Sequence, residues 1–151
     1  MEGLFLLSAV AGLMLDSAWL LSQDRGDWRA ASSNANSITG DLALSQSKVF
    51  INYTPFVIAQ IRKLEPSETS AIFAAEGAGS GGNLYRLNVP ANRRFLHHNT
   101  LCGSDDTQWM VTSVADRTLH VAFFSGTNTP VFTLEALNNS TDLCGTFTYL
   151  R

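Results

Sequence analysis

Residues 109–124 are the segment that most constrains the fold. Two apolar runs, 109–115 and 118–124, are separated only by Asp116-Arg117, which is the spacing of a tight β-hairpin. With a two-residue turn, the cross-strand pairs are Trp109 with Phe124, Met110 with Phe123, Val111 with Ala122, Thr112 with Val121, Ser113 with His120 and Val114 with Leu119. Away from the turn both faces of this hairpin are apolar. We therefore predict that it lies centrally in a sheet and is covered on both sides.

The rest of the chain after residue 37 mostly shows apolar residues with a period of two. Strands are expected at 38–44, 48–52, 56–64, 84–89 and 145–150, and one helical turn at 133–137. So many short strands in about 115 residues predict a mainly β, β-rich α+β fold. The expected architecture is a compact antiparallel barrel or sandwich with one or two short helices, formed by a single domain over residues 37–151.

A short helix is expected after Pro66. Proline suits the first helical turn, and Gly77 lies just past the expected end. Ala71, Ile72 and Ala75 are spaced to share one buried face.

Residues 1–22 form a hydrophobic segment. The apolar run at 4–15 is shorter than the roughly 20 residues that span a bilayer, and Asp16 interrupts it. A signal peptide is the leading interpretation; an upstream start would supply the basic n-region that Met1-Glu2-Gly3 lacks. The alternatives are an uncleaved anchor and a helix packed on the domain. Residues 23–36 are polar and aperiodic, which predicts a linker, with the mature domain beginning near Ala30.

Composition excludes some classes of protein. With 45% hydrophobic residues, the chain can form a core, so disorder throughout is excluded. A net charge of −3 with no basic run argues against a nucleic-acid partner, because neutralising phosphates requires clustered Lys and Arg. We expect contact with a membrane only through the N-terminal segment, if it stays uncleaved.

Cys102 and Cys144 are the two cysteines, and each lies in a Leu-Cys-Gly sequence. Together with the signal-like segment they predict a disulfide and an oxidising compartment, so a periplasmic or secreted protein is expected. Zinc would need further ligands at suitable spacing, and only His97 and His98 are obvious additions. We expect neither a metal nor a cofactor.

The chain also has a wider resemblance, which is carried by the runs LYRLNVPANRRFLHHNTLCGSDDTQWMVTSV, TLHVAFFSGTNTPVF and STDLCGTFTYLR. Together with ITGDLALSQSKVFINYTPFVIAQIRKL, they make residues 37–151 resemble a group of small exported proteobacterial proteins of uncharacterised function, with paired LCG motifs. The resemblance implies export and a disulfide, and it supplies no catalytic residues.

The candidates for catalysis lie in the segment before the hairpin. His97 or His98 with Asp105 or Asp106 would suit a small hydrolase, provided that a cleft closes around residues 93–106. Adjacent histidines on an extended chain point to opposite sides, however, which disfavours joint chemistry.

A non-enzymatic, exported binding domain of the bacterial cell envelope is therefore the leading hypothesis for function. Its partner is unknown and is expected to be an envelope protein. An inhibitor or immunity-like protein against a cell-wall hydrolase is one alternative, resting on architecture alone. The hydrolase is the other.

Overall fold

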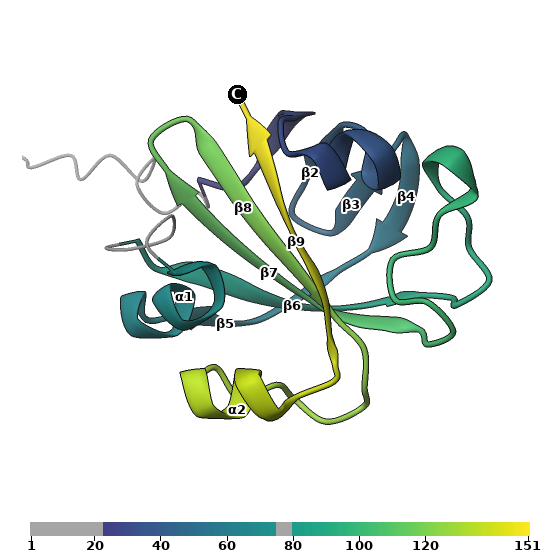
Figure 1. Ribbon diagram of the computed structural model, residues 1–151. Helices are drawn as coiled ribbons and strands as arrows, with labels where there is room; N and C mark the ends of the chain where they lie inside the picture. Colours follow the sequence, from purple (N-terminus) through teal and green to yellow (C-terminus); the bar gives the residue numbers. More distant parts are fainter. Residues whose placement is uncertain (1–22, 75–79) are drawn as a thin grey trace, which may run out of the picture.

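The computed structural model describes residues 23–74 and 80–151, and the predicted N-terminal hydrophobic helix lies outside them. In the described part, nine antiparallel strands form one sheet in the order β4-β3-β2-β1-β9-β8-β7-β6-β5 (Figure 1). The strands are β1 (Gly26–Ala30), β2 (Leu42–Leu44), β3 (Lys48–Ile51), β4 (Thr54–Val57), β5 (Ala59–Leu64), β6 (Gly82–Val89), β7 (Thr107–Ala115), β8 (Thr118–Phe124) and β9 (Leu143–Leu150). The helical segments are η2 (Ala35–Thr39), α1 (Pro66–Phe73), η4 (Leu96–His98) and α2 (Leu134–Asn139). The mainly β prediction is confirmed.

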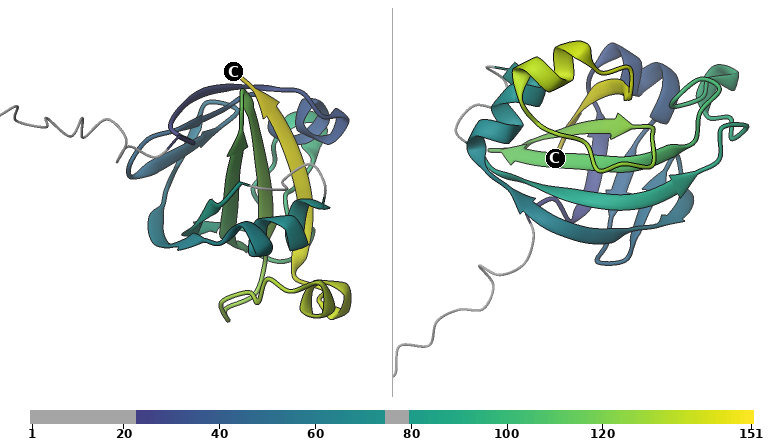
Figure 2. Two further views of the ribbon diagram at one scale, coloured as in Figure 1. Left: turned by 90° about the vertical axis from the view of Figure 1, so that its left-hand side faces the viewer. Right: turned by 90° about the horizontal axis from the view of Figure 1, so that it is seen from below.

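The sheet curls into a barrel because its two outer strands, β4 and β5, are consecutive parts of the chain. Ile58 alone separates them and is buried; β4 pairs with β3, whereas β5 pairs with β6. The chain thus turns a corner between β4 and β5 and passes from one half of the sheet to the other (Figure 2). Strand β1 makes the opposite corner, since it pairs with β2 over its first three residues and with β9 over its last two.

The predicted hairpin is β7–β8, and its register is confirmed for each predicted pair, including Ser113 with His120. One face, with Met110 and Phe123, lies in the main core inside the barrel. The other face, with Trp109 and Phe124, belongs to a second core that α1 and α2 help to cover. The hairpin is therefore covered on both sides, as its two apolar faces predicted.

The interior of the barrel is filled with large side chains. Aromatic and aliphatic residues from almost every strand are fully buried there; the largest are Trp28, Leu42, Ile51, Met110, Phe123 and Tyr149. The two hollows considered below lie on the outside of the barrel.

The predicted linker at residues 23–36 is wrong. It contains β1, and Trp28 of that strand is 1% exposed in the main core. Burial of this large indole ring stabilises the strand, although the residues on either side of it are polar. A domain that began near Ala30 would lack most of β1.

Other sequence-based boundaries also change. Only 42–44 of the expected first strand is extended, and Ile38 lies in the helical turn η2. The expected strand 56–64 is divided at the corner. Helix α1 ends at Phe73, because Ala74 takes a φ of 55°, and it buries Thr69 and Phe73. Ala71 and Ile72 of the predicted face are half-buried, and Ile72 packs against the second core; Ala75 and Gly77 lie outside the described residues.

The predicted disulfide between Cys102 and Cys144 is present, with an S–S distance of 1.99 Å. It connects the segment before β7 to the beginning of β9. Such bridges persist mainly outside the cytoplasm, so the disulfide fits a non-cytoplasmic protein. Within residues 23–74 and 80–151, none of the helices is long and apolar enough to cross a bilayer.

Candidate functional site

The histidines and aspartates considered for a hydrolase are not brought together. His97 and His98 lie in η4 and are exposed; the Nδ1 atom of His97 is 3.0 Å from the carbonyl oxygen of Ser37. Neither imidazole forms an ion pair with Asp105 or Asp106. The four side chains therefore do not form one acid–base centre in this structure.

Asp105 and Asp106 instead border a separate polar hollow of about 490 Å³, which Asp142 and Gln108 also line. The Asp106 carboxylate accepts a hydrogen bond from the backbone N–H of Ala91 at 2.7 Å, which ties two loops together. In the described part of the chain, the acidic, histidine and cysteine side chains form no group that could hold a metal ion.

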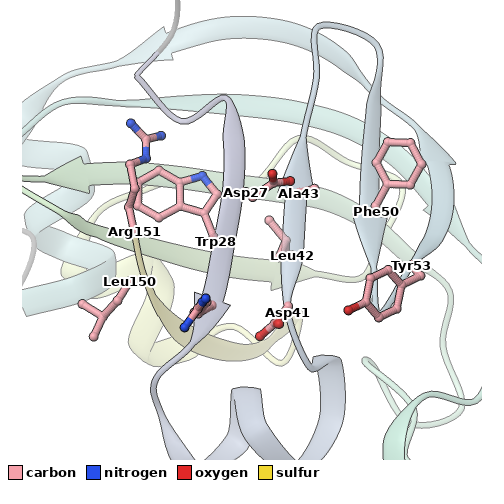
Figure 3. A pocket seen from close by; sticks show the side chains of 10 residues that line it. Asp27, Trp28, Asp41, Leu42, Ala43, Phe50, Tyr53, Leu150 and Arg151 are labelled. Carbon is pink, nitrogen blue, oxygen red and sulfur yellow. The ribbon is translucent and has the colours of Figure 1, made fainter.

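The larger hollow is an open groove of about 670 Å³ on the outside of the barrel. We call it the β1–β3 groove; it is lined by Asp27, Trp28, Arg29, Asp41, Leu42, Ala43, Phe50, Tyr53, Leu150 and Arg151. Figure 3 shows Leu150 and Arg151 on one side of β1, Phe50 and Tyr53 on the other side, and Asp27 and Asp41 between them. Its volume lies within the roughly 300–1,000 Å³ of small-molecule sites.

The groove lies at the corner where β1 leaves β2. Beyond Trp28, strand β1 pairs with β9, so Arg29 is opposite Leu150. The next backbone N–H, that of Ala30, donates to the Asp41 carboxylate at 2.9 Å instead of to a neighbouring strand. One Asp41 oxygen thus replaces a ladder hydrogen bond, and this holds the carboxylate at the edge of the groove.

Arg151 fixes the opposite side of the groove. Its guanidinium carbon lies 4.1 Å from the centroid of the Trp28 ring, a cation–π arrangement. The same guanidinium donates to the carbonyl oxygens of Gln23 and Arg25, at 3.0 and 2.7 Å. Arg151 therefore holds the chain that enters β1 against the end of β9.

A buried carboxylate supports the same strand from inside the barrel. Asp24 is 1% exposed, and its Oδ2 atom accepts hydrogen bonds from the hydroxyls of Tyr85 and Thr112, at 2.6 and 2.5 Å. Its backbone carbonyl accepts from the indole N–H of Trp28 at 2.8 Å. Because buried polar groups need such partners, these bonds orient Asp24 and Trp28 together.

Tyr53 occupies the turn between β3 and β4. Asn52 and Tyr53 have φ values of 46° and 67°, the positive sign that a type I′ hairpin turn requires at both positions. Glycine suits the second position, whereas a tyrosine there is strained. The ring gains little packing in return, since the residue is 85% exposed. A strained, exposed aromatic side chain beside a groove points to function.

Two opposite charges in the groove have no partner within the described residues. Asp27 and Arg29 are two residues apart in β1, so their side chains lie on the same face of the strand. Neither side chain makes a hydrogen bond or an ion pair with the described residues. Both are exposed, next to the apolar side chains of Ala43 and Phe50. These charges are available to a ligand.

The sequence pattern does not predict this groove, because residues 27–29 fall in the predicted linker. One signal was present: Val49-Phe50-Ile51 is apolar on both faces of a short strand, so Phe50 had to lie outside the core if its neighbours lay inside. Tyr53 had no such signal, since Asn-Tyr is not a typical type I′ sequence.

Comparison with known protein families, curated proteins and solved structures finds no match for this chain. Fold and site alone therefore define its class, which is a disulfide-linked antiparallel β-barrel with a filled interior and a mixed-charge groove on its outer face. The resemblance to exported proteobacterial proteins stays a prediction.

Proposed function

We propose that the protein is a non-enzymatic binding domain of the bacterial cell envelope, periplasmic or secreted, and that the β1–β3 groove is its binding site. The observation that carries the proposal is Tyr53, which is strained in its turn and exposed at the groove. A residue that weakens the fold without packing is best explained by a role in binding.

Two further observations support this proposal. Large side chains occupy the interior of the barrel in the described residues, whereas the groove on its outer surface offers apolar area next to unpaired charges. The disulfide fits a protein that matures in an oxidising compartment. The hydrolase alternative lacks this kind of support, because neither His97 nor His98 lines the hollow that Asp105 and Asp106 border.

The test of the site compares Tyr53→Gly with the matched control Leu134→Ser, which also removes an exposed apolar side chain but lies outside the groove. Uniformly ¹⁵N-labelled protein is titrated with envelope extract, separated into low-mass and high-mass fractions. We expect one fraction to shift the backbone amides of Asp27, Ala43 and Phe50 in the wild type and the control, and not in Tyr53→Gly. Equal shifts in Tyr53→Gly, or none in the wild type, would refute the proposed site.

The compartment is tested by alkylating the protein as it is recovered from cells that express the native gene. The mass should increase only when reduction precedes alkylation. Two thiols that react without reduction would contradict a location outside the cytoplasm.

A further inference from the structure

The order of chemical groups across the β1–β3 groove restricts what can bind there. Asp27 and Arg29 follow one another along one face of β1, and Arg29 is opposite Leu150 of β9. Arg151 follows β9, Asp41 precedes β2, and the rings of Phe50 and Tyr53 lie at β3 and its turn (Figure 3). A complementary ligand presents an anion and a cation along β1 and an apolar group toward β3.

The charges of the groove exclude simpler ligands. A phosphate or a polyanion would meet the carboxylates of Asp27 and Asp41, and a purely cationic ligand would meet the two arginines. A hydrocarbon would desolvate Asp27 and Arg29 without providing partners for them. A zwitterion with an apolar side chain pairs both signs and also covers the rings.

The dimensions of the groove fit a short peptide. Neighbouring strands are about 4.8 Å apart, so β1 and β3 are separated by about 10 Å. An extended peptide advances about 3.3–3.6 Å for each residue, so two or three residues span that distance. A terminal carboxylate, a basic side chain and an apolar side chain can all be placed within such a length.

We propose that the β1–β3 groove binds a short zwitterionic peptide, with its carboxylate at Arg29, its ammonium group between Asp27 and Asp41, and its apolar side chain on Phe50 and Tyr53. This inference rests on the proposed function and specifies its ligand. The contact with the rings also suits an ammonium group nearby, since aromatic faces attract cations.

The experiment uses three probes and the full chain. N-acetyl-Leu-Lys carries both charges, its C-terminal amide keeps only the cation, and its Nε-acetyl form keeps only the carboxylate. Affinities are obtained from the amide shifts of groove residues. We expect N-acetyl-Leu-Lys to bind about two- to fivefold more tightly than either blocked form, which is the range for one exposed ion pair.

Charge variants assign each end of the peptide. Asp27→Asn should weaken N-acetyl-Leu-Lys by about two- to fivefold and leave the Nε-acetyl form unchanged. Arg29→Gln should weaken the peptide that has a free carboxylate and leave the amide unchanged. Asp105→Asn, an exposed acidic residue outside the groove, is the matched control and should change none of the affinities.

The possible results separate this inference from the proposed function. Equal affinity for the three probes, or no binding by any of them while envelope extract still shifts groove amides, would overturn the peptide assignment and leave the binding domain intact. No groove shift with probes or extract would overturn both. Groove shifts that depend on protein concentration alone would identify a second copy of the chain as the occupant and refute the peptide.

Discussion

Removing the disulfide tests how much of the domain's stability depends on a single cross-link. Cys102 and Cys144 are separated by 42 residues, and the loop between them contains the central β7–β8 hairpin and α2. In the chain-entropy treatment, closing a loop of this length stabilises the folded state by about 4 kcal/mol at 25 °C. Domains of this size are stable by about 5–15 kcal/mol in total, so the bridge supplies a large share.

Urea unfolding of the oxidised and reduced wild type measures this contribution directly, because reduction keeps both sulfur atoms in place. The reduced protein should lose about 4 kcal/mol of unfolding free energy and about 10–20 °C in Tm. The double variant Cys102→Ala/Cys144→Ala should lose somewhat more, since both cysteines also pack against the main core.

A difference below about 1 kcal/mol between the oxidised and reduced wild type would refute this reasoning. It would mean that the unfolded chain already brings the two cysteines close together, so that the cross-link removes little entropy. A loss confined to the double variant would assign the effect to packing instead of to the bridge.

Three further predictions concern the barrel. Gly82→Ala places a Cβ atom 2.1 Å from a backbone carbonyl oxygen of β7 and should lower the free energy of unfolding in urea by at least about 2 kcal/mol. In Gly145→Ala the nearest neighbour of the new Cβ is a ring atom at 3.4 Å, so the loss should be less than about 1 kcal/mol. The hydrogen bond from Arg62 holds the pKa of Glu68 below its usual value, so this pair stabilises the fold above the pKa that the carboxyl has in the unfolded chain. Its contribution to the free energy of unfolding, about 1 kcal/mol or less, should disappear as the pH falls through the lowered pKa. Urea unfolding at several pH values measures this, and Glu68→Gln should lack the pH dependence. A chain that starts after β1 should give a circular dichroism spectrum without a cooperative thermal transition, since it lacks Trp28; a transition like that of the full chain would contradict the role assigned to β1.

The β7–β8 hairpin could be predicted in full because its constraints are local. Side chains alternate with a period of two, and a two-residue turn fixes the register. Every cross-strand pair of the hairpin therefore follows from the positions of the turn residues Asp116 and Arg117. The two apolar faces also indicated, correctly, that both sides are covered. The cysteine pairing followed from the count alone, since two cysteines allow a single bridge.

Strand β1 and the corner at Ile58 depend on distant residues and could not be predicted from local pattern. The sequence Gly-Asp-Trp-Arg-Ala has few strand-forming residues, and it becomes a strand because Trp28 enters the core and Arg151 holds it from the far end of the chain. Likewise, 56–64 is continuous in its strand pattern, and only the corner at Ile58 divides it between β4 and β5.

The β1–β3 groove could not be predicted for the same reason, and it is one place where the chain departs from local rules. In the β7–β8 hairpin, by contrast, strand pattern and burial agree, as they do in sequences that specify one fold. At the groove, Tyr53 takes a conformation that favours glycine, and Asp27 and Arg29 remain unpaired within the described residues. Such departures are expected where binding, and not stability, determines the residue. Tyr53→Gly should therefore keep or increase the free energy of unfolding while binding is lost, a combination that a purely structural tyrosine would not produce.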